Sequence, residues 1–101
     1  MDPLVDRIVR KIVEAIHPDK VILFGSRAQG TSDGDSDIDL VIVYSGPRSK
    51  RDVQVHIHKL FSHPDFSLDV FVLTPEELEA QRGVANSLAR EVAERGLTCY
   101  G

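Results

Sequence analysis

One short segment of the chain combines residue types that could bind a phosphate group. Gly25 and Ser26 directly follow an apolar run over residues 21–24, which is typical of a buried strand. Gly25 has no side chain, so the backbone can approach a ligand closely there. If a helical turn begins over residues 26–29, its unpaired N–H groups and the positive end of its dipole point toward an anion. A triphosphate tail fits such a turn.

Two carboxylates follow at the start of the next apolar run. Asp37 and Asp39 flank Ile38, and side chains alternate between faces along a strand, so both carboxylates are expected on one face. Two carboxylates on adjacent positions of one face repel each other unless a cation lies between them. Hard oxygen ligands suit Mg²⁺, which usually takes one or two protein carboxylates together with substrate phosphates. The pair therefore predicts a magnesium site.

A third carboxylate, Asp69, is the only charge in the apolar stretch over residues 66–73. Because Asp37 and Asp69 both lie near the starts of their strands, they meet only if those strands are parallel. Parallel neighbours need a crossover connection, which residues 49–62 can supply. The strand over residues 21–24 ends where the strand after Asp37 begins, so that pair is predicted to be antiparallel. We therefore expect a mixed sheet with Gly25, Ser26 and the carboxylates at one edge.

Together these residues resemble a known family. Ten residues separate Gly-Ser from Asp-x-Asp, and a further aspartate follows in a later strand. This pattern resembles the signature of the DNA polymerase β-like nucleotidyltransferase superfamily. The short chain resembles its minimal nucleotidyltransferase branch, and the similarity covers roughly residues 19–73. The resemblance implies an α/β (α+β) fold, in which a small mixed β-sheet packs with helices as in the polymerase β palm.

The resemblance also implies an activity and assigns roles to residues. The family transfers a nucleoside monophosphate from an NTP to an acceptor, using two Mg²⁺ ions. Asp37, Asp39 and Asp69 would be the catalytic residues and the metal ligands. The nucleotide-binding residues would be Gly25, Ser26 and Arg27, with Ser26 and the backbone near Gly25 at the β- and γ-phosphates. ATP or another NTP is the implied substrate.

A protein partner is implied by the resemblance as well. Minimal nucleotidyltransferases often act as antitoxins beside HEPN-type proteins, in some cases by transferring AMP to a toxin tyrosine. This chain lacks the additional acceptor-binding domain of larger relatives, so a second protein is expected to supply the acceptor hydroxyl. The alternative is a non-catalytic antitoxin that neutralises a HEPN-type partner by contact. Intact Ser26, Asp37, Asp39 and Asp69 favour the enzyme, because a binding module has no chemical need for them.

Each of these residues also has an ordinary structural explanation when it is taken alone. Ser26 could simply cap a helix after a strand-to-helix turn. Asp37 and Asp39 could belong to a solvated acidic loop, and Asp69 could face water from an edge strand. Only their joint spacing between apolar strands distinguishes a catalytic site from these explanations.

The composition predicts one small domain over residues 1–101. Formal net charge is −4, which argues against stable binding of long nucleic acid, since that normally requires a basic face. With a single cysteine, Cys99, no disulfide can form within the chain. No apolar stretch is long enough for a bilayer and no signal peptide is visible, so we expect a cytoplasmic protein that does not bind membranes. The sequence leaves a homo-oligomer open.

The remaining segments are expected to position the site. A helix should begin at Pro3 and end near His17, because apolar residues recur along it at helical spacing. Residues 53–58 fit either a strand or a helix, and the need for a crossover favours helix. As a strand, this segment would bring two histidines together as a conceivable zinc site. Residues 74–77 predict a helix start with a capping box, followed by a helical region that Gly83 breaks and Gly96 closes.

Overall fold

A computed structural model describes residues 3–25, 37–61 and 66–101, and within them four strands form one mixed sheet. The strands are β1 (Lys20–Phe24), β2 (Ile38–Val43), β3 (Leu68–Leu73) and β4 (Leu97–Tyr100). Their order across the sheet is β3-β2-β1-β4. β1 pairs antiparallel with both of its neighbours, whereas β2 and β3 are parallel. The predicted mixed sheet is therefore confirmed.

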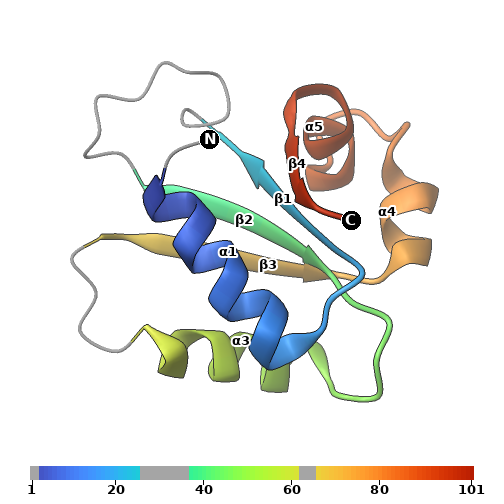
Figure 1. Cartoon of the computed structure of the whole chain (residues 1–101). Coiled ribbons are helices and arrows are strands. Elements are labelled where there is room, and N and C mark those ends of the chain that lie inside the picture. The colour runs from blue at the N-terminus through green and yellow to red at the C-terminus, as the bar shows by residue number, and fades with distance from the viewer. Residues whose placement is uncertain (1–2, 26–36, 62–65) are drawn as a thin grey trace.

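Four helices lie around this sheet in the described part of the chain (Figure 1). They are α1 (Pro3–Ile16), α3 (Lys50–Leu60), α4 (Pro75–Gln81) and α5 (Leu88–Arg95). The side chains of Ser49, Thr74 and Ser87 accept a backbone N–H at the starts of α3, α4 and α5. Such caps satisfy donors that the first turn of a helix leaves unpaired, so these serine and threonine positions explain where the three helices begin.

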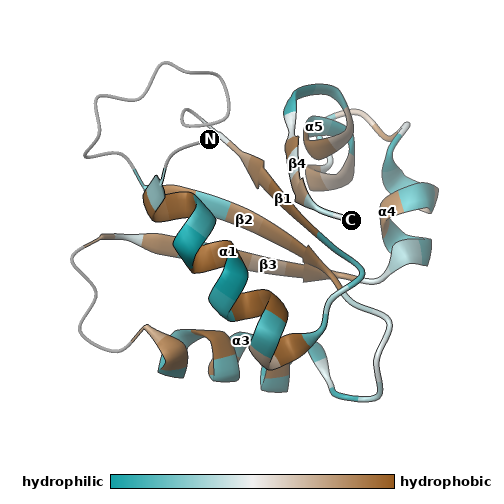
Figure 2. Ribbon diagram, in the orientation of Figure 1, coloured by the Kyte–Doolittle hydropathy of each residue, from teal (hydrophilic) through white to brown (hydrophobic). Residues whose placement is uncertain are grey.

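The helices divide between the two faces of the sheet. α1 and α3 pack on one face, where Ile38, Leu40 and Ile42 of β2 are completely buried. We call this the α1/α3 face. The other face carries a smaller cluster around Val41 and Val43, packed with Val92 of α5, and we call it the α5 face. Figure 2 shows the apolar strands between helices whose surfaces alternate between hydrophobic and hydrophilic residues. The period-two alternation of β2 thus places its even-numbered and odd-numbered residues on different faces.

The connection from β2 to β3 settles the ambiguous segment over residues 53–58. It forms part of α3, and its apolar residues Val53 and Ile57 are buried in the core of the α1/α3 face. Parallel strands require a crossover of this kind, so the topology decides between two patterns that the local sequence fits equally. In a helix, residues two apart do not face each other, and His56 and His58 therefore do not form the conceivable zinc pair.

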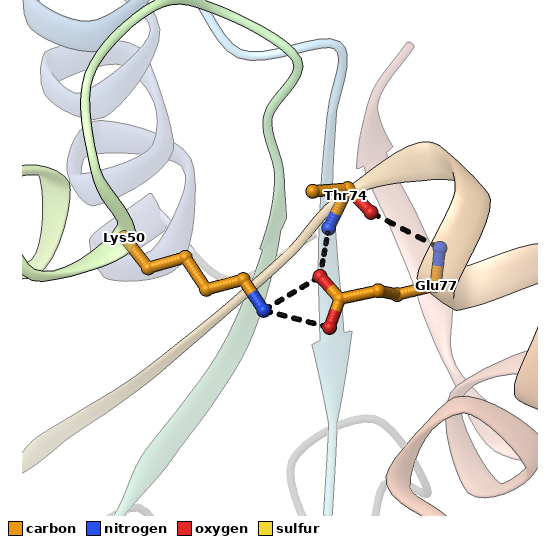
Figure 3. Close-up of polar contacts among 3 residues, drawn as sticks. All are labelled: Lys50, Thr74 and Glu77. Carbon is orange, nitrogen blue, oxygen red and sulfur yellow. Dashed lines mark hydrogen bonds and ion pairs between the residues drawn. The ribbon is translucent and has the colours of Figure 1, made fainter.

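A polar contact links the starts of α3 and α4 at one end of the sheet (Figure 3). Lys50 Nζ lies 2.6 Å from Glu77 Oε1 and 2.7 Å from Oε2. Glu77 also accepts a hydrogen bond from the backbone N–H of Thr74, while its own N–H donates to the Thr74 hydroxyl. The predicted capping box is confirmed, and its glutamate ties two helices together as well.

The C-terminal region contains a strand that the sequence did not predict. The helical region breaks after α4, and α5 ends at Gly96, as expected. Residues 97–100 then pair with β1 as the edge strand β4. Four residues with mostly exposed side chains carry too little periodicity to identify a strand locally. Among the described residues, no helix has the length and apolar character needed to cross a membrane.

Candidate active site

Asp39 and Asp69 lie directly opposite each other on two neighbouring strands. In the parallel ladder of β2 and β3, Asp39 is the register partner of Asp69. On β2, Leu40 belongs to the core of the α1/α3 face, and so does Val70 on β3. Alternation therefore directs both aspartates toward the α5 face. The sequence predicted that these two strands run parallel and so bring carboxylates together, and the parallel pairing is confirmed.

Gly25 brings the end of β1 against the same carboxylate. Its φ is +80°, a conformation that residues with a side chain rarely adopt. A Cβ built on Gly25 would lie 2.6 Å from Asp39 Oδ2, so no side chain fits between the turn and the carboxylate. The pairing of Phe24 with Asp39 across β1 and β2 fixes this approach. Segments centred on residues 25, 39 and 69 thus converge at one end of the sheet.

The electrostatics of this end are unfavourable for ionised aspartates. Partial burial raises the pKa of Asp39 above its ordinary value. The negative charge of Asp69 raises this pKa further, as do a side-chain hydrogen bond with Asp69 and the nearby charge of Asp37. Like charges held this close favour a shared proton or a bound cation. The carboxylate pair therefore has the chemical character of a cation site.

The other predicted site residues are placed less fully. Asp37 is exposed and lies directly before the first residue of β2. The paired residues of β2 and β3 begin one position later, at Ile38, so the partner of Asp69 is Asp39 and not Asp37. Ser26 and Arg27 lie outside the described residues. In the described part of the chain, no group of three or more histidine, cysteine, aspartate or glutamate side chains is arranged to hold a metal ion. The three-carboxylate metal site stays a prediction.

Two donors nevertheless fit a magnesium ion. Mg²⁺ in nucleotide enzymes is usually held by one or two carboxylates, and substrate phosphates and water supply its remaining ligands. Asp39 and Asp69 provide two hard oxygen donors from adjacent strands, and their mutual repulsion would be relieved by a divalent cation. Two carboxylates can therefore be the protein ligands of a Mg²⁺ ion, without a third protein ligand.

Sequence reasoning missed one acidic neighbour of this pair. Glu91, in the first turn of α5, contributes negative charge that also raises the pKa of Asp39. A hollow of about 500 Å³ runs along α5 and has Glu91 in its wall. The sequence gives no local signal for this proximity, because it depends on how α5 packs over β1 and β2. Glu91 makes the α5 face more acidic than the three predicted aspartates alone would.

Comparison with known proteins agrees with this fold. The nucleotidyltransferase domain family matches residues 6–96, and the chain belongs to that family. This membership confirms the nucleotidyltransferase family that the motif spacing predicted. No curated protein sequence matches the chain.

Several solved structures share the fold. A toxin–antitoxin complex with AMP-PNP superposes with a TM-score of 0.62 at 21% identity, covering 95% of this chain and 73% of that chain. A tri-AMPylated HEPN toxin in complex with its MNT antitoxin, from Shewanella oneidensis, gives a TM-score of 0.59 at 17% identity and covers 100% and 73%. A nucleotidyltransferase described as putative, from Sulfolobus solfataricus, gives 0.56 at 26% identity and covers 76% and 69%.

Proposed function

We propose that this nucleotidyltransferase transfers AMP from ATP to a hydroxyl group of a partner protein, and that the partner is a HEPN-type toxin. The observation that carries the proposal is the register pairing of Asp39 with Asp69 beside Gly25. This arrangement joins a glycine at the end of β1 with two carboxylates that favour a cation. Membership of the nucleotidyltransferase domain family supports nucleotidyl transfer as the chemistry of this site.

The reaction moves one phosphoryl centre between two oxygen atoms. The acceptor oxygen forms a bond to the α-phosphorus of ATP, the bond to the β-phosphate bridge breaks, and pyrophosphate leaves while the acceptor loses its proton. When bound, Mg²⁺ held by Asp37, Asp39 and Asp69 would neutralise the negative charge of the triphosphate and of these carboxylates. Two such ions are expected from the family.

The chain's own residues position this reaction. Gly25 has no side chain, so the Asp39 carboxylate can lie directly against the end of β1, where the triphosphate is expected. Asp39 is partly buried against Gly25 and holds the inner position. Asp69 is exposed, so it is the carboxylate that an incoming hydroxyl can reach. Rate enhancement would then come mainly from orientation and charge neutralisation.

The choice of acceptor is supported by fold similarity to toxin–antitoxin proteins. One of these relatives is a complex between an MNT antitoxin and a tri-AMPylated HEPN toxin, and another contains AMP-PNP. If this chain likewise transferred AMP to a toxin, one small domain could act as an antitoxin by modifying its partner. Neutralisation by contact alone is the competing mechanism, and it requires neither Asp39 nor Asp69 to be ionisable.

The test is a transfer assay with the full chain, α-labelled ATP, Mg²⁺ and the product of the neighbouring gene as candidate HEPN-type partner. Replacing Asp39 by Asn keeps the size of the side chain but removes its charge. We expect at least about 100-fold slower labelling of the partner, because electrostatic stabilisation is lost. Intact-mass measurement would show one added AMP, about 329 Da, per modified hydroxyl.

Asp19→Asn is the matched control, since it makes the same chemical change at an exposed aspartate before β1. Its labelling rate should stay within about twofold of the parent chain, as is usual for exposed sites away from the chemistry. Partner binding, followed separately by calorimetry, should be unchanged in both variants. If the Asp39→Asn variant neutralised the toxin as well as the parent chain does, and neither the toxin nor the antitoxin became labelled, neutralisation through contact would replace the transfer mechanism.

A further inference from the structure

The surface of α3 that points away from the sheet carries a shallow, positively charged groove. Its volume is about 310 Å³. We call it the α3 groove, and the residues that line it are Arg48, Arg51, Asp52, Val55, His56 and Lys59. It lies on the layer that covers the α1/α3 face, whereas Asp39 and Asp69 point to the α5 face. The groove is therefore separate from the candidate active site.

Helical spacing explains how the groove forms. The lining residues within α3 make two neighbouring rows with a spacing of four, one of Arg51, Val55 and Lys59 and the other of Asp52 and His56. Arg48 precedes the helix and reaches the second row through its side chain. Val53 and Ile57 are completely buried on the opposite side of the helix. Because that side anchors α3 in the core, both rows are held toward solvent with a fixed orientation.

One side of the groove is organised by a hydrogen bond. Arg48 Nη1 lies 2.9 Å from His56 Nδ1, and Arg48 Nη2 donates to the backbone carbonyl of Asp52 at 3.3 Å. A guanidinium group has donors only, so Arg48 is the donor in its contact with the His56 ring. Arg48 is thus held over the groove while its charge stays unneutralised.

The charges of the groove favour an anion. Arg48, Arg51 and Lys59 contribute three positive charges and Asp52 one negative charge, so the lining carries +2 in a chain of formal net charge −4. Elsewhere on the surface, Arg10 and Arg82 are paired with carboxylates. Within the described ranges, neither Arg51 nor Lys59 takes part in an ion pair.

We propose that the α3 groove docks an acidic peptide segment of a second protein. Carboxylates of that segment would meet Arg51 and Lys59, and an apolar side chain between them would cover Val55, which is 44% exposed. From residue 51 to 59 a helix rises about 12 Å, so the surface suits a few side chains of a peptide. Asp52 interrupts the positive surface of the groove, so carboxylates spaced apart along a peptide can avoid it, whereas the continuous row of phosphates of a nucleic acid strand cannot.

The test is a fluorescence anisotropy titration of the full chain with a fluorescein-labelled peptide of glutamates around a central leucine. The charge-reversed variant R51E/K59E should bind this peptide about 10-fold more weakly, because two attractive contacts become repulsive. The matched variant R10E/R82E changes the net charge by the same amount at exposed arginines outside the groove. It should stay within about twofold of the parent chain.

Three results would overturn the proposal. Equal weakening in both double variants would assign the effect to the overall charge of the protein. Tighter binding of an oligonucleotide of equal charge, lost in R51E/K59E, would make the groove a nucleic-acid site. A dimer of the parent chain in sedimentation, abolished by R51E/K59E, would make the occupant a second copy. Should R51E/K59E lose its circular dichroism spectrum, R51Q/K59Q serves the same comparison without introducing acidic groups.

Discussion

The two faces of the sheet divide stability and chemistry between them. On the α1/α3 face, Leu40 and Ile42 are completely buried under two helices. On the α5 face the cluster is smaller, Phe71 stays 40% exposed, and the end of the sheet carries Asp39 and Asp69. Apolar burial on the α1/α3 face makes the folded state more stable. This burial lets the second face hold two repelling carboxylates that weaken the fold, and their charge is then available to a ligand.

The largest expected effect is on the buried face. Leu40→Ala should lower the free energy of unfolding by about 2 to 5 kcal/mol, because it removes buried methyl groups and leaves a cavity. Phe71→Ala, on the α5 face, should cost only about 1 to 2 kcal/mol, because its side chain already contacts water. Urea denaturation of the two variants measures the difference. Equal losses would show that the faces contribute alike, and the comparison would fail.

A second effect is expected at Gly25, which directly follows β1. Gly25→Ala should cost about 1 to 3 kcal/mol, because a residue with a side chain is strained at positive φ. The new Cβ would also displace the Asp39 carboxylate, so nucleotide transfer should fall with stability. Gly83→Ala is the control, since a Cβ there meets no atom within 4 Å. Thermal unfolding of both variants checks this, and similar melting temperatures would contradict it.

The carboxylate pair should respond to pH in a characteristic direction. The folded pKa of Asp39 is raised, so the folded state holds its proton more tightly than the unfolded state does. Stability from this group is fully present below the unfolded pKa, about 3.9, and is lost as pH rises through the higher folded value. Asp39→Asn should therefore stabilise the metal-free chain at pH 7, by roughly 0.5 kcal/mol for removal of a like-charge pair.

A double-mutant cycle with Asp69→Asn isolates this repulsion. Each single variant should stabilise the chain at pH 7, and the double variant should add little to either, because one neutral partner already removes the repulsion. Urea denaturation as a function of pH supplies the measurement. Fully additive gains would mean that the two side chains do not interact.

A similarly small effect is expected at the contact between α3 and α4. Glu77→Gln keeps a side-chain oxygen for the capping box but removes the charge that faces Lys50. Because both side chains are substantially exposed, the loss should be about 0.2 to 1 kcal/mol. The hydrogen bond from Lys50 lowers the pKa of Glu77, so this stability is present above the unfolded pKa and is lost as pH falls through the folded value. High salt should shrink the difference between parent and variant.

Much of the site's framework followed from local patterns in the sequence. Alternation along residues 37–43 separates the aspartates from the buried isoleucines, and the short connection between β1 and β2 implies an antiparallel pair. The carboxylates can meet only if β2 and β3 are parallel, and parallel strands require a crossover, which residues 49–62 can supply. These arguments depend only on the chain's geometry, and the structure agrees with each of them.

Other features depend on packing between distant segments. The register that places Asp69 opposite Asp39, and not Asp37, joins strands about thirty residues apart in the sequence, and the local patterns do not specify it. β4 owes its existence to an open edge on β1, which its own sequence does not reveal. Glu91 approaches Asp39 only because α5 lies over the strands. Local periodicity carries no information about such placements.

The direct pairing of Asp39 with Asp69 has a consequence for how the chain tolerates insertions and deletions. The segment between β2 and α3 lies outside the ladder, and its length can change while the two carboxylates stay together. A single residue deleted between Asp69 and the buried Val72 would instead turn the Asp69 side chain by one step of the pleat, toward the α1/α3 face. Homologous enzymes should therefore differ freely in loop length yet keep an odd spacing between this aspartate and the buried valines that follow it.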